Sequence, residues 1–424
     1  MATIDIPYGK TCQRLILDDA RLAGVLRPSG EALSDVSPET IIREALERPI
    51  GSPPLSELAR GKRRVLVITS DHTRPVPSRL TLPPMLAAIR QGSPDADIVI
   101  LIATGMHRPT TEAELRRKLG DGIVDREAIV VHDARRDEDM SLIGTLPSGG
   151  ALRVNRLVPW AELVVSDGFI EPHFFAGFSG GRKSILPGVA SRETVLYNHN
   201  AGFIAHPLAA QGSLNGNPLH RDMAYAARTA GLRFILNVLL GDGHRVIAAF
   251  AGDPEEAHAA GCALSLRLTR VMPVEAEIAV TSNGGYPLDQ NLYQAVKGMT
   301  AAEACVKPGG AIVMCAALDD GHGGEDFFNW FALRANPAEV ARDIAQVPPE
   351  ETRMDQWEAQ ILARVLGKAT CFFVTGEENR ALVERMHMRW APDVNAAVAA
   401  ATALLGDSAR VTVIPDGVGV VVRA

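Results

Sequence analysis

Three residues with side chains suited to catalysis or ligand binding lie in one glycine-rich passage, residues 168–200. They are His173, Lys183 and His199, and the passage reads GFIEPHFFAGFSGGRKSILPGVASRETVLYNHN. Glycine permits backbone conformations with positive φ and the close approach of a ligand. A lysine in such a loop can contact a phosphate or form a covalent bond. A histidine can accept a proton or bind a metal, so this passage is the leading candidate for a functional site.

A phosphate-binding P-loop is an alternative interpretation of the lysine. That motif reads G-x-x-x-x-G-K-[ST]. From Gly177 the chain reads GFSGGRKS, so Arg182 stands where the motif requires its second glycine. The sequence therefore disfavours a P-loop.

The spacing of the candidate ligands does not match a zinc site. His173 and Lys183 are ten positions apart, His199 follows sixteen positions later, and no H-E-x-x-H motif is present. A metal bound here would be incompletely ligated by protein side chains, and a cofactor would have to complete its coordination. His199, between two asparagines, is alternatively a helix-end histidine with no ligand.

Two further polar loops follow apolar runs that predict strands. Val65–Thr69 leads into SDHTRP, with Asp71 and Arg74, and Ile98–Ala103 leads into TGMHRP, with His107. An arginine can hold a carboxylate or phosphate through two parallel hydrogen bonds. The alternative is that the aspartate caps a turn, the arginine is solvated and the histidine is structural.

Three helices are predicted from local patterns. The segment TTEAELRRKLG has Thr110 or Thr111 as a candidate N-cap. Gln294 and Lys297 stand at i, i+3 and share one helical face, which is either part of a binding site or a solvated surface. Asn395–Leu405 is a plain helix followed by glycine.

Apolar runs alternating with helical patterns predict parallel sheets covered on both faces. Besides the two runs above, they lie at Leu163–Ser166, Phe234–Leu240, Ile278–Thr281, Ala311–Ala316 and Cys371–Val374. The polar clusters follow these runs, as expected for ligand sites beyond the carboxyl ends of strands. For 424 residues we expect two α/β domains with mainly parallel sheets, residues 1–271 and 272–424.

Composition restricts the class of protein. With 46% hydrophobic and 22% charged residues, the chain matches a globular protein. A net charge of −7 argues against nucleic acid or an anionic membrane as a partner. The N-terminus lacks a secretory pattern, and no apolar run is long enough to span a membrane. The five cysteines are scattered, which favours a cytoplasmic location.

The chain resembles the nickel-dependent lactate racemase family, whose members carry a nickel-pincer nucleotide. Matching segments run from SDHTRPVPS at Ser70 to DQWEAQ at Asp355, and the longest is EPHFFAGFSGGRKSILPG. The resemblance implies an isomerase that racemises or epimerises lactate or a related 2-hydroxy acid. It also implies a catalytic N-terminal domain and a C-terminal domain that closes over the substrate, with the active site in the cleft between them.

The resemblance implies a role for each matching residue. Lys183 is expected to bond covalently to the cofactor, a pyridinium-3-thioamide-5-thiocarboxylate mononucleotide, and His199 to bind its nickel. His107 and His173 are expected to be the acid and base. The other expected cofactor contacts are Asp71, Arg74, Gly180, Gly181 and Trp357. The expected substrate contacts are Arg74, Tyr293, Gln294 and Lys297, with Arg74 and Lys297 converging on the carboxylate.

The chemistry of the reaction explains the need for a cofactor, because no side chain accepts a hydride. In the implied reaction, one histidine removes the hydroxyl proton while the hydride passes to the nickel-pincer nucleotide, giving a 2-keto acid. The hydride then returns to the other face, and the opposite histidine reprotonates the oxygen.

Two other functions remain open at the level of sequence. The chain can be a non-catalytic carrier or assembly protein for the nickel-pincer nucleotide, although a carrier needs no acid–base pair. A nicotinamide dehydrogenase is disfavoured because no G-x-G-x-x-G follows a strand. The expected partners are the 2-hydroxy acid and, transiently, the cofactor-synthesis enzymes, and a homodimer is compatible with the sequence.

Overall fold

The computed structural model describes residues 1–29 and 36–423, which form two compact units. The central unit comprises residues 36–199 and 206–265. The terminal unit comprises residues 1–29, 200–205 and 266–423. Each unit is built on a six-stranded sheet with helices, so the expectation of two α/β domains with mainly parallel sheets is confirmed.

The central sheet has the strand order β13-β12-β9-β4-β5-β6. All neighbouring strands are parallel except the antiparallel pair β12 and β13. The strands are β4 (Arg64–Ser70), β5 (Asp97–Ala103), β6 (Ala128–Val131), β9 (Leu163–Phe169), β12 (Leu232–Leu240) and β13 (Val246–Gly252). The inner strands are buried on both faces, as their continuous apolar sequences require.

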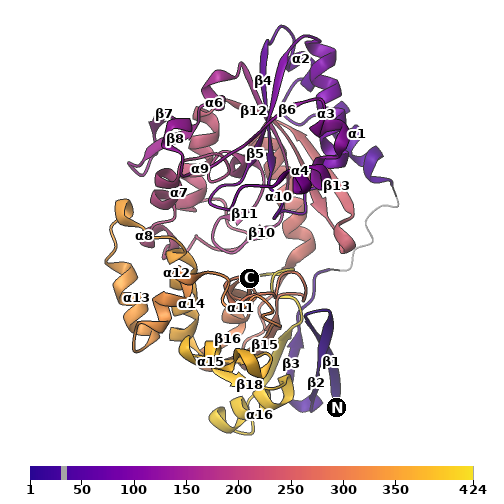
Figure 1. Cartoon of the computed structure of the whole chain (residues 1–424). Helices are drawn as coiled ribbons and strands as arrows, with labels where there is room; N and C mark the ends of the chain where they lie inside the picture. The colour runs from indigo at the N-terminus through magenta and orange to yellow at the C-terminus, as the bar shows by residue number, and fades with distance from the viewer. Residues whose placement is uncertain (30–35, 424) are drawn as a thin grey trace. The chain divides into compact units, whose positions relative to one another are not determined.

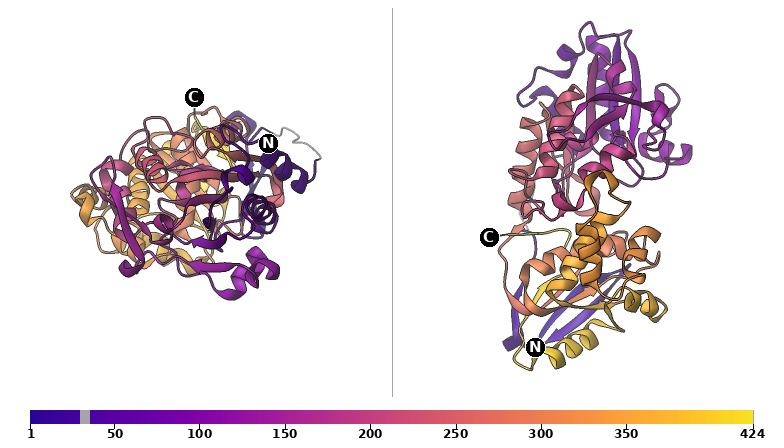
Figure 2. Two further views of the ribbon diagram at one scale, coloured as in Figure 1. Left: turned by 90° about the horizontal axis from the view of Figure 1, so that it is seen from above. Right: turned by 90° about the vertical axis from the view of Figure 1, so that its left-hand side faces the viewer.

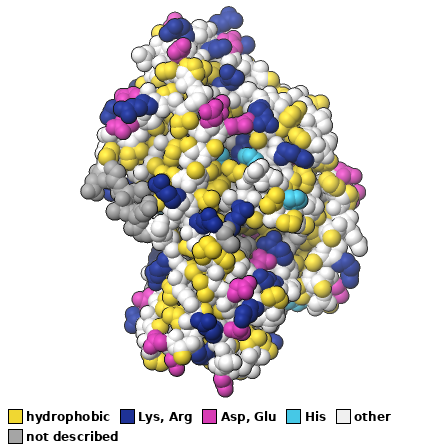
Figure 3. All heavy atoms as spheres, turned by 180° about the vertical axis from the view of Figure 1, so that it is seen from behind, with side chains coloured by type: hydrophobic (Ala, Val, Ile, Leu, Met, Phe, Trp, Pro, Cys, Tyr) yellow, Lys and Arg dark blue, Asp and Glu magenta, His cyan; other side chains and the backbone are white. Residues whose placement is uncertain are grey.

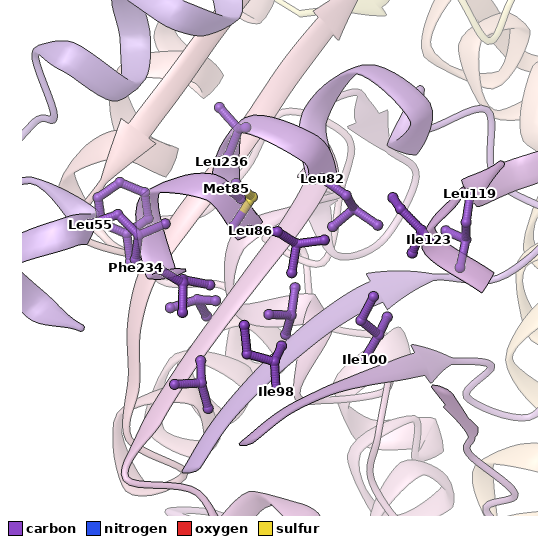
Figure 4. Packing of buried hydrophobic residues seen from close by; sticks show 14 of the residues in the cluster. Leu55, Leu82, Met85, Leu86, Ile98, Ile100, Leu119, Ile123, Phe234 and Leu236 are labelled. Carbon is purple, nitrogen blue, oxygen red and sulfur yellow. The ribbon is translucent and has the colours of Figure 1, made fainter. Parts of the chain in front are cut away.

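Helices cover both faces of the central sheet, with α1 to α3 on one side and α6 and α9 on the other (Figure 1). The helices of the central unit are α1 (Pro38–Glu47), α2 (Leu55–Leu58), α3 (Ser78–Gly92), α4 (Glu112–Leu119), α5 (Asp121–Val124), α6 (Leu157–Trp160), α7 (Arg192–Asn198), α9 (Pro218–Thr229) and α10 (Glu256–Thr269). Figure 4 shows Leu82, Met85 and Leu86 of α3 packed over Ile98 and Ile100 of β5. This spacing places the three helix residues on one face, which buries them in the core.

Short elements beyond the strands complete the central unit. Two antiparallel ribbons are present, β7 (Met140–Thr145) with β8 (Ala151–Asn155) and β10 (Pro172–His173) with β11 (Gly177–Phe178). Three 3₁₀ turns are η2 (Asp137–Asp139), η3 (Gly181–Ser184) and η4 (Asp242–His244). The β10–β11 ribbon and η3 carry the candidate residues of the glycine-rich passage.

The terminal sheet is parallel throughout, in the order β18-β17-β16-β15-β19-β3. Its strands are β3 (Leu22–Val25), β15 (Ala276–Ser282), β16 (Val306–Cys315), β17 (Thr370–Val374), β18 (Arg389–Ala391) and β19 (Val411–Ile414). Two small pairs accompany it, β1 (Ala2–Tyr8) with β2 (Thr11–Leu17) and β14 (Arg270–Val271) with β20 (Val421–Val422).

The helices of the terminal unit are α8 (Ala201–Ile204), α11 (Leu292–Cys305), α12 (Glu325–Ala332), α13 (Pro337–Ala345), α14 (Gln356–Lys368), α15 (Arg380–Arg385) and α16 (Val394–Leu405). The 3₁₀ turns are η1 (Asp19–Arg21), η5 (Pro349–Glu351) and η6 (Glu377–Asn379). The β1–β2 hairpin lies beside α16 (Figure 2), where the Ile16 N–H donates to the Asn395 side chain at 2.9 Å.

The division into units differs from the predicted domains at the N-terminus. The predicted boundary near residue 272 lies close to the break within α10, at residues 265 and 266. Residues 1–29, however, group with the C-terminal part of the chain, because β3 pairs in parallel with β19. Nearly 400 residues separate these two strands, and a local sequence pattern carries no information about such a pairing.

Local predictions agree with the structure. The seven apolar runs lie within β4, β5, β9, β12, β15, β16 and β17, except that Ala316 follows the last residue of β16. Several of the strands extend beyond the predicted runs. Thr111 is the N-cap of α4, in a reciprocal capping box with Glu114. The predicted C-terminal helix is α16, and it ends before Gly406, whose φ is 97°.

The distribution of surface charge and the length and apolar character of the helices bear on possible contacts with charged partners or membranes. Over the face shown in Figure 3, basic and acidic side chains are interspersed rather than segregated by sign. No helix in the described part of the chain has the length and apolar character needed to cross a lipid bilayer.

Candidate active site

A histidine–carboxylate pair lies where β4 and β5 end. The Nδ1 of His107 is 2.7 Å from Oδ2 of Asp71, and Thr73 donates its backbone N–H and its hydroxyl to Oδ1, the hydroxyl at 2.7 Å. Asp71 is buried, which by itself raises its pKa, but the hydrogen bonds from His107 and Thr73 bring the pKa below its ordinary value. An ionised carboxylate only accepts hydrogen bonds, so Nδ1 of His107 carries a proton. The neutral ring therefore has its lone pair on Nε2, as a general base requires.

An Asp71→Asn variant is expected to lose about a hundredfold in racemisation kcat. The substituted amide no longer favours a proton on Nδ1, so the base at Nε2 is lost in part of the molecules. The measurement is kcat alongside the NMR tautomer of His107. Thr73→Val is the control because it removes the hydroxyl that contacts both Asp71 and Nδ1 of His107 but keeps the carboxylate that accepts the Nδ1 proton. Unchanged kcat in Asp71→Asn would contradict a positioning role for this carboxylate.

Lys118, at the end of α4, supports the loop that carries Arg74. Its Nζ donates to the carbonyl oxygens of Arg74 at 3.2 Å and Val76 at 3.4 Å. Burial lowers the pKa of Lys118, and the nearby carboxylates of Asp167 and Asp71 oppose that shift. Sequence analysis did not single out this lysine, since the run RRK at a helix end is typical of a solvated surface.

The second candidate histidine, His173, lies on the β10–β11 ribbon with its ring against two phenylalanines. The centroid of its ring is 5.0 Å from that of Phe174, in a stacked arrangement, and 4.6 Å from that of Phe175, edge to face. Its Nδ1 accepts the backbone N–H of Ala176 at 3.3 Å. A backbone amide only donates, so the proton of the neutral ring is on Nε2. His107 and His173 therefore hold their protons on opposite ring nitrogens.

The candidate tether, Lys183, lies in η3, directly after two glycines with positive φ. Gly180 has φ 76° and Gly181 has φ 53°. A Cβ at Gly180 would lie 2.6 Å from the side-chain oxygen of Asn237, and the Gly181 N–H donates to that same oxygen at 2.7 Å. Gly180 is therefore required by the close approach of β12, and Gly181 by that of His258 on α10, whose ring would lie 2.7 Å from a Cβ at position 181.

Arg182 connects this loop to the ribbon that carries His173. Its buried guanidinium donates to the Ala176 carbonyl at 2.7 Å and lies 3.1 Å from Nε2 of His258. The residue that disfavours a P-loop in the sequence thus holds the two candidate segments together. This contact was not predicted.

His199 follows the last residue of α7 and is buried. Its Nδ1 lies 2.9 Å from the carbonyl oxygen of Val195, which can only accept, so Nδ1 is protonated and the lone pair is on Nε2. Burial and then the positive charge of Lys183 lower the pKa of His199 to about 3, so the ring stays neutral. A neutral imidazole held by a backbone carbonyl is the usual form of a metal-binding histidine.

The described residues contain no group of three or more His, Cys, Asp or Glu side chains arranged to hold a metal ion. A nickel ion bound to His199 would therefore take its other ligands from a different source. Sulfur donors of a cofactor tethered at Lys183 have the required chemistry. The residues present fit the group that the sequence resemblance implies.

In the terminal unit, α11 carries three of the predicted substrate residues. Lys297 donates from Nζ to Oε1 of Gln294 at 2.6 Å, so the prediction of a shared helical face is confirmed. Trp357, on α14, donates from Nε1 to the hydroxyl of Tyr293 at 3.0 Å. Asn291 caps α11 and fixes where its first turn begins.

Two carboxyl groups in the same part of the terminal unit, one half-buried and one fully buried, were not predicted to be functional. Asp355 has φ 58°, and burial, followed by repulsion from Asp326, raises its pKa to about 6. Glu358 is fully buried, and burial raises its pKa despite the opposing charge of Lys297. Both lie in the segment DQWEAQ, so the only available signal was their proximity in sequence to Trp357.

Comparisons with known proteins cover the whole chain. Residues 8–212 match the lactate racemase N-terminal domain and residues 271–422 match the lactate racemase C-terminal domain. The lactate racemase of Thermoanaerobacterium thermosaccharolyticum is 51% identical, and that of Lactiplantibacillus plantarum is 48% identical, each over 424 residues and all of both chains. The structure of the lactate racemase apoprotein from Thermoanaerobacterium thermosaccharolyticum superimposes with a TM-score of 0.97 over all of both chains, at 50% identity. The chain therefore belongs to the lactate racemase family and is an isomerase.

Proposed function

We propose that this protein racemises lactate, or a closely related 2-hydroxy acid, by moving a proton and a hydride reversibly. The observation that carries the proposal is the opposite proton placement on His107 and His173. One ring presents a lone pair at Nε2 and the other a proton at Nε2. His107 therefore presents a base in the resting protein. His173 presents a hydrogen-bond donor, which becomes a general acid when the ring takes up a second proton at Nδ1.

We propose that a nickel-pincer nucleotide is the cofactor, tethered to Lys183 with its nickel bound by His199. When bound, this group supplies the hydride acceptor that no side chain provides. The neutral state of His199 and the rigid glycine turn beside Lys183 support the assignment. We propose that Gly180 and Gly181 contact the cofactor through their backbone atoms.

The chain's own residues carry the proton steps. Nε2 of His107 accepts the hydroxyl proton of one enantiomer, and Asp71 stabilises the imidazolium that results. His173, as the imidazolium, returns a proton from Nε2 to the oxygen when the carbon has been inverted, and it is left as a neutral ring with its lone pair on Nε2. In the reverse direction the two histidines exchange roles, because each step is reversible. Asp71 thus positions His107, since its Oδ1 accepts from Thr73 of the same loop and its Oδ2 accepts from Nδ1 of His107.

The substrate-binding roles follow the charges of the predicted residues. Arg74 offers a planar guanidinium and Lys297 an ammonium group oriented by Gln294, and we propose that each binds the substrate carboxylate. Tyr293 and Trp357 are joined by a hydrogen bond, which fixes their side chains. We assign substrate contact to the tyrosine and cofactor contact to the tryptophan.

An Arg74→Lys variant is expected to lose roughly ten- to a hundredfold in kcat/KM. Lysine keeps the charge but loses the two parallel hydrogen bonds that orient a carboxylate. The measurement compares lactate with its neutral amide in wild type and in the variant. The amide is expected to be the poorer substrate in wild type, and equal turnover of acid and amide would contradict binding of a carboxylate.

The decisive test of the proposed function is a racemisation assay across chiral 2-hydroxy acids. The protein is produced together with the cofactor-synthesis enzymes, and chiral chromatography follows each enantiomer. Lactate is expected to racemise fastest. Absence of racemisation of every acid, in protein that carries the nucleotide, would favour the carrier function instead.

We further propose a cytoplasmic location and transient contact with the cofactor-synthesis enzymes. All five cysteines are free thiols, four of them buried, as in proteins of a reducing compartment. A covalently tethered cofactor must be delivered to Lys183 by the enzymes that make it.

A further inference from the structure

Glu358 is a carboxyl group buried without a hydrogen-bond partner. It lies in the first turn of α14 with no exposed surface. Neither of its oxygens has a hydrogen-bond partner among the described residues. A buried, unsatisfied carboxylate is costly, so such a group either carries a proton or is compensated by a nearby positive charge.

The charges around Glu358 come from two directions. Lys297 of α11 favours the ionised form, and Asp355, three residues earlier in the chain, disfavours it. Asp326 of α12 acts in turn on Asp355. The lysine is therefore the positive group that decides whether Glu358 can ionise.

The other elements packed against α14 supply no competing charge near Glu358. In α8 there is no titratable side chain, and β16 and β17 contribute the buried thiols Cys315 and Cys371. The charged residue of β16, Lys307, is exposed and pairs with Glu277. The remaining acidic groups of neighbouring helices have partners of their own. Asp343 of α13 pairs with Arg334, Glu303 of α11 with Arg364 and Glu325 of α12 with His322, and Glu339 of α13 accepts the Ala335 N–H.

We propose that Glu358 couples the binding of a substrate carboxylate at Lys297 to the uptake of one proton. The inference rests on the proposed role of Lys297 in substrate binding. When Glu358 is ionised, it and the substrate carboxylate compete for the same ammonium group. The bound substrate carboxylate neutralises the positive charge of Lys297 that had stabilised ionised Glu358. Glu358 then takes a proton from solvent and becomes neutral. When Glu358 is already protonated, the substrate binds without this step.

The coupling predicts how affinity depends on pH. Below the pKa of Glu358 the lysine charge is available to the substrate, and affinity is constant. Above that pKa each binding event requires one proton, so affinity falls by about tenfold per pH unit. The effect appears in the dissociation constant and in KM rather than in kcat, because Glu358 does not touch the reacting atoms.

The experiment uses the cofactor-loaded protein and 2-hydroxyisobutyrate, an anion that has no hydrogen on its carbinol carbon and cannot racemise. Isothermal titration calorimetry in buffers of different ionisation enthalpy measures the protons taken up per ligand bound, from mildly acidic to alkaline pH. Wild type is expected to take up about one proton in the alkaline part of the range. Glu358→Gln is expected to take up none and to bind with an affinity that no longer falls as pH rises.

Two further variants make the outcome specific. Asp355→Asn keeps Glu358 and is expected to retain proton uptake, with the transition moved to lower pH because a repelling charge is gone. Lys297→Met is expected to weaken binding and to abolish the coupling. Binding by wild type without proton uptake, or uptake that persists in Glu358→Gln, would overturn this inference alone. Failure of wild type to bind the anion at all would also overturn the proposed carboxylate site.

Stability gives a readout that does not depend on the ligand. The pKa of Glu358 is raised in the folded protein, so between the ordinary value of 4.5 and the folded value the native state binds more protons than the unfolded state. The free energy of unfolding therefore falls as pH rises through this window. Chemical denaturation is expected to show a shallower fall in Glu358→Gln than in wild type, and equal slopes would show that Glu358 titrates normally.

Discussion

A Lys183→Ala variant is expected to carry no covalently bound nucleotide and to show no measurable racemisation. Alanine has no nucleophile to form the bond, and without the tethered group the protein has no hydride acceptor. Intact-mass measurement of protein made with the cofactor-synthesis enzymes, followed by peptide mapping, gives the site of the adduct. Racemisation of lactate by the same preparations gives the activity.

Lys62→Ala is the matched control for the tether. Lys62 also belongs to the central unit but lies just before β4, at the amino end of the strand, whereas η3 follows β9. The control is expected to keep both the adduct and the activity. An adduct that maps to another lysine, or active protein with no adduct, would refute the assignment of Lys183.

Single substitutions His107→Ala and His173→Ala are each expected to lower kcat/KM by about 10²–10⁴ while the nucleotide stays attached. This range is the usual contribution of a positioned general acid or base. The two enantiomers have equal free energy, so each variant must lose the same factor in both directions. Chiral assays started from each enantiomer, together with intact mass, provide the measurement.

The double variant His107→Ala, His173→Ala separates an enzyme from a carrier. It is expected to lose racemisation while retaining the adduct at Lys183, since neither histidine is required for tethering. The loss is expected to be smaller than the product of the two single losses, because the residues act in one reaction. If either single variant keeps wild-type activity, that histidine is not the acid or base.

Local features of the fold could be read from the sequence. Apolar runs such as Val65–Thr69 and Ile278–Thr281 form buried strands because a strand covered on both faces needs continuous apolar residues. The cap of α4 at Thr111 and the shared face of Gln294 and Lys297 depend only on helix geometry. These features involve residues close together in the chain, so nearest-neighbour patterns determine them.

The pairing of β3 with β19 could not be read in that way. Both are short apolar strands. β3 occupies the edge of the terminal sheet and pairs with β19, whose other side already pairs with β15. The N-terminal residues therefore belong to the terminal unit, against the predicted domain division. Edge pairing depends on the assembled sheet, which the local sequence does not describe.

For the candidate site, the sequence by itself determined the residue types and, through the long match to one family, the roles that we propose. Those roles for His107, His173, Lys183 and His199 stay predictions until the variants are measured. Only the tertiary structure decided the proton positions, because each depends on a partner distant in sequence or fixed by a turn. Asp71 sets the tautomer of His107 from 36 residues away, and the Ala176 amide sets that of His173.

The tertiary structure also decided which charged side chains lie near the candidate site residues. Lys118 under the Arg74 loop, Arg182 against Ala176 and Glu358 near Lys297 carry no signal in the sequence, because a charged residue on a helix is normally solvated. Their burial follows from packing between elements that fold from separate parts of the chain. Burial changes the protonation of such groups, and it is a property of the packed structure rather than of any segment.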